Sequence, residues 1–117
     1  MLKKKFSILL ILLFFLPNFI NSEIIQGKVK VIDGDTVKIK NNKIRLSGID
    51  APELNQLCSK VFLSLSFISF NKKYSCGKIS TEKLKRLIKN ETILCKVENI
   101  DRYKRKLATC YKNKLNI

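Results

Sequence analysis

Three short runs of alternating apolar and polar residues, separated by tight turns, constrain the fold of this chain more than any other feature. Residues 24–32 (IIQGKVKVI), 36–40 (TVKIK) and 43–46 (KIRL) set valine, isoleucine or leucine against charged residues. This period-two alternation is typical of β-strands with one buried face. An Asp-Gly pair and an Asn-Asn pair stand between the runs, and both pairs are turn signals. The segment therefore predicts a three-stranded antiparallel meander.

The remaining pattern predicts one helix and two more strands. Ser80 opens an amphipathic helix, with residues 92–98 and 105–111 as the fourth and fifth strands. Residues 61–70 are apolar apart from three serines and are typical of a strand or hairpin arm, for which the sequence offers no evident partner. The apolar face of the helix comprises Ile79, Leu84, Leu87 and Ile88, and its outer face Lys83, Lys85, Arg86 and Lys89.

Five short strands with one helix between the third and the fourth predict a mainly β (α+β) domain. The specific expectation is a small five-stranded Greek-key barrel of the oligonucleotide-binding (OB) type. A generic α+β domain is the alternative.

The first 22 residues have the composition of a secretory signal peptide. Three lysines at positions 3–5 precede an apolar run over residues 6–16, and Pro17 ends that run. The run is short for a bilayer span, which needs about 20 apolar residues. We expect an exported protein (secreted, periplasmic or at the cell surface) whose residues 23–117 form one domain. An uncleaved membrane anchor and a buried N-terminal helix are the alternatives.

Composition limits the chemistry that this domain can perform. The chain has no histidine, which excludes histidine-based triads and the commonest metal ligand. Residues 23–117 contain 21 Lys and Arg against nine Asp and Glu, a net charge of +12. A charge of this sign and size favours a polyanionic partner, bound through counterion release.

Four cysteines, at positions 58, 76, 95 and 110, stand in the part expected to be exported. They show no C-x-x-C spacing, so a zinc site is not expected. In an exported chain, two disulfides are the natural use. The favoured pairing is Cys58–Cys76 with Cys95–Cys110, because each closes a loop within one local unit. Free buried thiols are the alternative.

The few acidic residues and arginines stand out in this lysine-rich chain. Asp33, Asp35, Asp50 and Glu53 fall within 21 residues. Closure of the strands into a barrel would bring the second and third of these together as a hard-oxygen site for Ca²⁺ or Mg²⁺. Arg45 and Arg105 are two of only four arginines, and arginine suits bidentate phosphate binding. The alternatives are that the aspartates only form turns and that the arginines are surface charges.

Three segments together resemble the thermonuclease (staphylococcal nuclease) family. They are residues 31–39 (VIDGDTVKI), 43–53 (KIRLSGIDAPE) and 101–108 (DRYKRKLA). The resemblance covers residues 25–111 apart from 59–75. It implies an OB-type barrel and Ca²⁺-dependent hydrolysis of DNA and RNA, single-stranded or locally open, without sequence specificity. The implied products carry 5′-hydroxyl and 3′-phosphate ends.

The resemblance also implies a role for each matched residue. Asp35 and Asp50 would be Ca²⁺ ligands, together with the backbone carbonyl of Ala51. Glu53 would accept a proton from the attacking water or orient it. The two arginines, Arg45 and Arg105, would hold the phosphate and stabilise charge in the transition state. Thr36 and Asp33 would support the metal ligands.

The sequence departs from the family pattern in three places. Lys104 stands where the family usually has glycine, and residues 60–74 are apolar where the family has a polar loop. The C-terminal helices of the family are not expected in this chain.

Three functions are consistent with the sequence. The first is a secreted, monomeric Ca²⁺-dependent nuclease, and the second an inactive or truncated nucleic-acid-binding barrel. The third is a cationic membrane-surface protein that inserts residues 61–70 beside Lys72 and Lys73. For the nuclease, contact with a membrane is expected only if the N-terminal segment is uncleaved.

Overall fold

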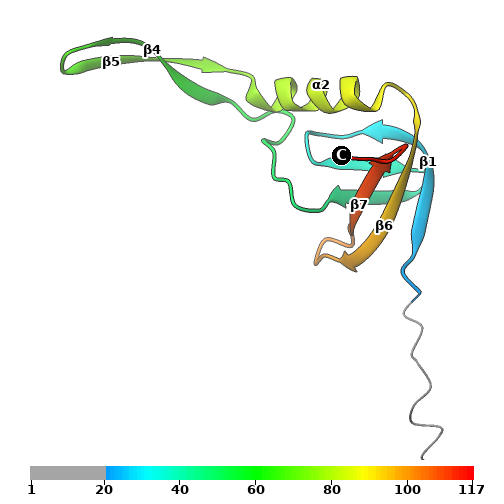
Figure 1. Cartoon of the computed structure of the whole chain (residues 1–117). Helices are drawn as coiled ribbons and strands as arrows, with labels where there is room; N and C mark the ends of the chain where they lie inside the picture. The colour runs from blue at the N-terminus through cyan, green and yellow to red at the C-terminus, as the bar shows by residue number, and fades with distance from the viewer. Residues whose placement is uncertain (1–20) are drawn as a thin grey trace, which may run out of the picture.

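The computed structural model describes residues 21–117, so that residues 1–20 of the expected signal peptide lie outside the described range. The described part contains a β-barrel, one long helix and a projecting hairpin (Figure 1). Labels follow the figure. The strands are β1 (Ile24–Val31), β2 (Thr36–Ile39), β3 (Asn42–Leu46), β4 (Cys58–Leu65), β5 (Ile68–Tyr74), β6 (Thr92–Ile100), β7 (Lys106–Lys112) and β8 (Leu115–Asn116); the helix is α2 (Cys76–Ile88).

Five strands close into a barrel, which confirms the predicted fold class. β1, β2 and β3 form the antiparallel meander, β6 pairs with the free side of β1, and β7 pairs with β6. A parallel pairing of β3 with β7, in which Arg45 lies opposite Leu107, closes the circle. Closure fixes Arg45 near the start of β7, and this junction places the candidate site.

The core confirms the inward positions read from the alternation. Val37, Ile39, Ile44 and Leu46 of the meander are each at most 1% exposed. They pack in one cluster with apolar residues of the other barrel strands and of α2. The alternation therefore predicted correctly which side chains of these strands point into the core, because each strand has only one face toward it.

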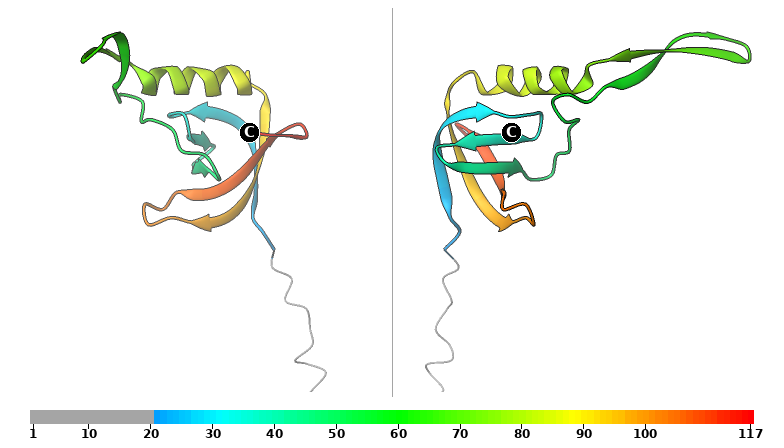
Figure 2. Two further views of the ribbon diagram at one scale, coloured as in Figure 1. Left: turned by 60° about the vertical axis from the view of Figure 1, so that its left-hand side comes forward. Right: turned by 180° about the vertical axis from the view of Figure 1, so that it is seen from behind.

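Helix α2 begins earlier than the sequence predicts. It starts at Cys76 rather than Ser80, and its buried stripe runs through Gly77, Thr81, Leu84 and Ile88. These positions recur at helical spacing, and the last two join the barrel core. The expected apolar face was therefore wrong in part: Ile79 and Leu87 are 47% and 42% exposed, because they lie off this stripe. Figure 2 shows α2 lying across one side of the barrel.

Both disulfides have the predicted pairing. Cys95 and Cys110 lie directly opposite each other on β6 and β7 and are fully buried. Cys58 and Cys76 join the start of β4 to the start of α2. The first link therefore joins two adjacent barrel strands within the core, and the second ties the base of the hairpin to the helix.

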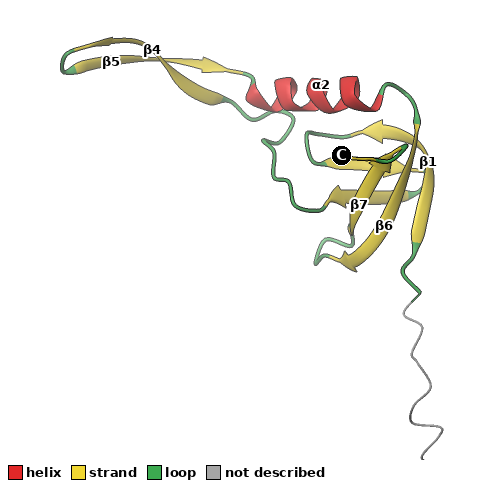
Figure 3. Cartoon of the chain, in the orientation of Figure 1, coloured by secondary structure: helices red, strands yellow, loops and turns green. Residues whose placement is uncertain are grey.

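Residues 58–74 form an antiparallel hairpin that pairs with no other strand of the described chain. It extends away from the barrel beyond the N-terminal end of α2 (Figure 3). The strand partner that the sequence did not reveal for residues 61–70 lies within the same segment, because β4 pairs with β5. Among the described residues, no helix has the length and apolarity needed to cross a membrane.

Candidate active site

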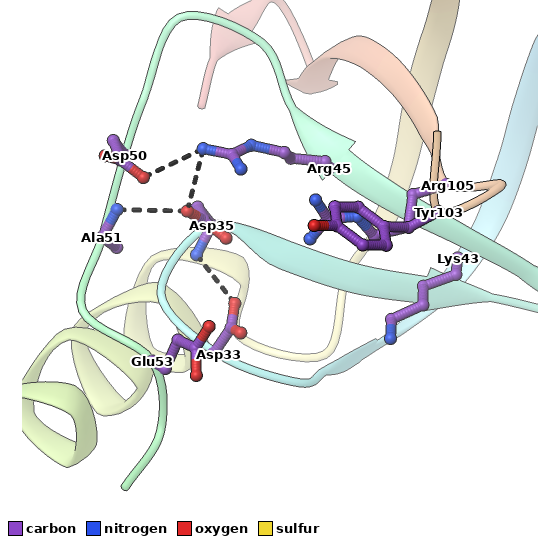
Figure 4. A pocket seen from close by; sticks show the side chains of 9 residues that line it. All are labelled: Asp33, Asp35, Lys43, Arg45, Asp50, Ala51, Glu53, Tyr103 and Arg105. Carbon is purple, nitrogen blue, oxygen red and sulfur yellow. Dashed lines mark hydrogen bonds and ion pairs between the residues drawn. The ribbon is translucent and has the colours of Figure 1, made fainter. Parts of the chain in front are cut away.

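A cleft at the junction of β2, β3 and the start of β7 collects every site residue predicted from the sequence. Its volume is about 520 Å³. Figure 4 shows the side chains around it, which come from segments up to 72 positions apart in the chain. The lining residues are Asp33, Asp35, Lys43, Arg45, Asp50, Ala51, Glu53, Tyr103 and Arg105.

Asp35 is the buried acid of the cleft, with 5% of its surface exposed. Its Oδ1 accepts a hydrogen bond from the Thr36 hydroxyl (2.8 Å), and its Oδ2 accepts one from the Ala51 backbone N–H (3.1 Å). Burial by itself raises the pKa of Asp35, but these hydrogen bonds, with help from Arg45, outweigh it and leave the pKa below its usual value. Asp35 therefore stays negatively charged.

Arg45 joins the two carboxylates that the sequence predicts as metal ligands. Its Nη2 lies 2.9 Å from Oδ1 of Asp50 and 3.5 Å from Oδ2 of Asp35 (Figure 4). The Asp50 side chain is 90% exposed, whereas Arg45 is 30% exposed. Two carboxylates therefore converge on one positive charge at the mouth of the cleft.

Asp33 lies beside Asp35 in the turn between β1 and β2. The backbone N–H of Asp35 donates a hydrogen bond to Oδ1 of Asp33 (3.3 Å). Burial is the largest influence on Asp33 and raises its pKa, and the neighbouring Asp35 carboxylate adds to the rise. The pKa of Asp33 is therefore raised and that of Asp35 lowered, so that Asp33 holds a proton more readily than Asp35 does.

Glu53 is exposed and lies in the irregular loop between β3 and β4. The loop turns back on itself, because the Gln56 backbone N–H donates to the Glu53 carbonyl (2.8 Å) and the Gln56 side chain accepts from the Glu53 N–H (3.2 Å). Within residues 21–117, the Glu53 carboxylate makes no hydrogen bond or ion pair with another side chain. This carboxylate is thus available to a water or a ligand in the cleft.

Two glycines let this loop approach the rest of the structure. A Cβ on Gly77 of α2 would lie 1.7 Å from the Glu53 carbonyl oxygen, and a Cβ on Gly34 would lie 2.7 Å from the Cβ of Ala51. Neither position can hold a larger residue without moving the backbone or side chains around the site. The Gly77 N–H also donates to the Gln56 carbonyl (3.2 Å), which fastens the loop to the start of α2.

Arg105 is positioned by Asp101 across the turn between β6 and β7. Asp101 accepts from the Arg105 backbone N–H (2.9 Å) and from its Nε (2.7 Å). Burial tends to raise the pKa of Asp101, but the bonds from Arg105 and from the Tyr103 N–H reverse the effect and lower it. The guanidinium of Arg105 also lies 5.4 Å from the centre of the Tyr103 ring.

Residues 43–117 match the family model described as "Staphylococcal nuclease homologue". The chain belongs to the staphylococcal nuclease family. It is 33% identical over 92 residues to the "Succinoglycan biosynthesis protein ExoI" of Rhizobium meliloti (strain 1021), a match that covers 78% of this chain. The match covers 44% of that protein, so the chain spans less than half the length of this curated relative.

Sequence reasoning missed three residues of the site of this staphylococcal nuclease homologue. Lys43 and Tyr103 line the cleft, and Asp101 orients Arg105. The signal for Asp101 was present, because an aspartate four positions before an arginine, across a tight turn, can accept both from the backbone and from the guanidinium. Lys43 could not be distinguished by sequence from the other exposed lysines of the barrel.

The structure brings the two expected aspartate ligands together without forming a recognisable metal centre. In the part of the chain that the structure describes, no group of three or more His, Cys, Asp or Glu side chains could hold a metal ion. The third ligand implied by the family resemblance is a backbone carbonyl, which such a group does not include.

Proposed function

We propose that this staphylococcal nuclease homologue is an exported, monomeric, Ca²⁺-dependent nuclease that hydrolyses DNA and RNA without sequence specificity. The observation that carries the proposal is the cleft itself. It places a buried carboxylate, an exposed carboxylate and two arginines around one space of about 520 Å³. Phosphodiester hydrolysis needs these groups, since water must be positioned and charge on the phosphate oxygens stabilised.

The donor set of the cleft fits a hard divalent cation. Asp35 and Asp50 already share one cationic nitrogen of Arg45, so their charges converge. We assign Ca²⁺ binding to these two carboxylates with the backbone carbonyl of Ala51, because Ca²⁺ accepts carboxylate and carbonyl oxygens in flexible geometry. When bound, the ion would supply Lewis-acid stabilisation of a phosphate oxygen.

The protein's own side chains account for the proton and the phosphate. The exposed Glu53 carboxylate would take a proton from a water whose oxygen attacks phosphorus. The bond from phosphorus to the 5′ oxygen would break, and that oxygen would gain a proton from solvent water, leaving 5′-hydroxyl and 3′-phosphate ends. Arg45 and Arg105 would hold the equatorial oxygens with their planar donors.

A row of lysines on the outer barrel surface supports a polyanionic substrate. Lys30 of β1 lies directly opposite Lys38 of β2, which lies opposite Lys43 of β3 at the cleft. Like charges directly opposite each other destabilise a sheet, and an anion lying along them removes that penalty. A nucleic-acid backbone bound along this row would lead to the cleft. Tyr103, 66% exposed, offers a ring on which an unpaired base can stack.

The test is degradation of single-stranded DNA, duplex DNA and RNA by the purified 117-residue chain, with Ca²⁺, with Mg²⁺ and with EGTA. We expect hydrolysis with Ca²⁺, poor activity with Mg²⁺, which demands stricter geometry, and none with EGTA. Glu53→Gln should lower turnover by about 10²-fold or more while DNA binding persists. The control is Glu82→Gln, an exposed glutamate on α2 that pairs with Lys85.

The outcomes distinguish the proposed enzyme from the alternatives. Products whose 5′ ends accept a phosphate from a kinase without prior phosphatase treatment would confirm the 5′-hydroxyl ends. DNA binding without hydrolysis in any metal would instead make the protein a nucleic-acid-binding barrel. Hydrolysis that is equally fast with EGTA would contradict the assigned role of Ca²⁺.

A further inference from the structure

The β4–β5 hairpin exposes apolar side chains that the barrel does not use. Every residue from Ser59 to Tyr74 is exposed, and Phe67 at the tip is 99% exposed. Figures 1 and 2 show the hairpin extending away from the barrel, beyond the N-terminal end of α2. An isolated two-stranded hairpin gains little stability in water, so a ribbon with this composition needs a partner surface.

The two faces of the distal hairpin (residues 63–70) differ in chemistry. Leu63 lies opposite Phe70, and Leu65 lies opposite Ile68. Cross-strand partners share a face, and so do residues two positions apart, so these four side chains form one apolar face. The pair between them, Ser64 and Ser69, lies on the other face. The distal hairpin is therefore an amphipathic ribbon.

Two lysines follow the apolar pairs on the same face. Lys60 lies opposite Lys72, which is two positions after Phe70. The ammonium of Lys60 also lies 5.7 Å from the centre of the Tyr74 ring. From tip to base the face thus presents apolar, cationic and aromatic side chains in that order. This order matches the interface of a bilayer, where lysine extends to the phosphates and tyrosine lies at the headgroups.

We propose that residues 62–70 insert into the interfacial region of an anionic lipid bilayer, with Lys60 and Lys72 at the level of the lipid phosphates. Charge complementarity decides between a bilayer and a second copy of the chain. A second copy would place two pairs of these lysines against each other, in a protein whose net charge is +15. An anionic surface attracts the same lysines.

The size of the ribbon limits the insertion to the outer part of the bilayer. About four residues separate the lysine pair from the tip, which at roughly 3.3 Å per residue spans about 13 Å. Amphipathic segments bury their apolar face by roughly 5–10 Å at the headgroup boundary. Deeper insertion would place the unpaired backbone groups of both ribbon edges in hydrocarbon. The hairpin would therefore hold the barrel beside the membrane, and this inference stands independently of nuclease activity.

The absence of tryptophan from the sequence allows a direct test of the tip. Phe67→Trp would be the sole tryptophan of the full chain. We expect its emission to shift to shorter wavelength with vesicles of phosphatidylcholine and phosphatidylglycerol, and brominated lipids to quench it. Pure phosphatidylcholine vesicles should have much less effect. Leu87→Trp, on the exposed side of α2, is the matched control and should not respond.

Charge variants separate insertion of the hairpin from attachment by another segment. In the Phe67→Trp background, Lys60→Gln with Lys72→Gln should raise the lipid concentration for half-maximal shift by about tenfold or more. Lys83→Gln with Lys114→Gln removes the same charge elsewhere and should change it far less. No shift with anionic vesicles would overturn the proposal. A shift that needs no lipid and grows with protein concentration would also overturn it, in favour of a second copy.

Discussion

At the scale of single residues, the charge state and orientation of each cleft side chain depend on its immediate neighbours. Asp35 is kept ionised by the Thr36 hydroxyl and the Ala51 N–H, while Asp33 next to it is the readier to hold a proton. On the other side of the cleft, Asp101 uses both carboxylate oxygens to fix Arg105. Asp35 therefore depends on Thr36 and Ala51, which the family resemblance already indicated, whereas Arg105 depends on Asp101, which it did not indicate.

Lys104 carries a conformational cost at the turn before Arg105. Its φ is +60°, the left-handed region, which explains why glycine is the usual residue at this position of the family. We expect Lys104→Gly to raise the free energy of unfolding by up to about 1 kcal/mol, because a side chain there costs roughly 1–2 kcal/mol and glycine returns part of the gain as unfolded-state entropy. Urea denaturation would measure it.

Lys114→Gly is the control for that prediction. Lys114 is also an exposed lysine in a turn, but its φ is not positive. The glycine should therefore leave stability unchanged or lower it. An equal gain from both variants would show that the removed positive charge, and not the backbone conformation, accounts for the effect.

At the scale of elements, the contact between α2 and the loop that carries Glu53 determines where the Glu53 carboxylate lies, to which we assign the role of general base. Gly77→Ala would force the Glu53 carbonyl away, since the added Cβ would lie only 1.7 Å from it. Displacement by about 1 Å can cost about 10²-fold in rate. We expect turnover on single-stranded DNA to fall by about that factor while affinity for DNA changes little, measured as separate kinetic and binding constants.

Gly48→Ala provides the contrast for the Gly77 substitution. Gly48 lies in the same loop with φ +77°, but a Cβ there meets nothing within 4 Å. Its substitution should lower stability through backbone strain and leave turnover of the folded protein nearly unchanged. If both variants lost turnover equally, general loosening of the loop would be the better explanation.

The sequence was sufficient for the barrel strands and for the carboxylates and arginines of the cleft, but not for Lys43 and Tyr103. Alternation marked Val37 and Ile39 as core residues, and the family resemblance supplied Arg45 and Glu53. It was insufficient for the hairpin, because apolar side chains that face solvent instead of a core violate the rule by which strands are predicted. The sequence also predicted the buried face of α2 incorrectly in part. Nothing in the sequence distinguishes the exposed Ile79 from an isoleucine of the core.

At the scale of the whole molecule, a small core depends on its covalent links. One buried cluster unites the five barrel strands with α2, and Cys95 and Cys110 are part of it. In the chain-entropy model each disulfide adds about 3 kcal/mol, against a total stability of roughly 5–15 kcal/mol for a domain. We therefore expect reduction of both disulfides to unfold the barrel and abolish nuclease activity, as followed by circular dichroism and DNA digestion.

Two double substitutions separate the contributions of the two disulfides to stability. Cys95→Ala with Cys110→Ala should reproduce most of the loss of secondary structure. Cys58→Ser with Cys76→Ser should retain the barrel spectrum, because that link joins the hairpin base to α2 outside the main cluster. A reduced wild-type protein that keeps its spectrum and its activity would show that the packed core alone is sufficient.

The Cys58–Cys76 link also makes the projecting hairpin a closed side loop of the covalent structure. The two sulfurs bracket all of β4 and β5, so the peptide bonds between them are not needed to keep the two parts of the molecule joined. A protease in the surroundings that cuts this exposed segment would produce two fragments that remain one particle, with the barrel and its cleft intact. A single cut would open the hairpin into two separate arms, both still attached to the barrel, while every site residue stays in place.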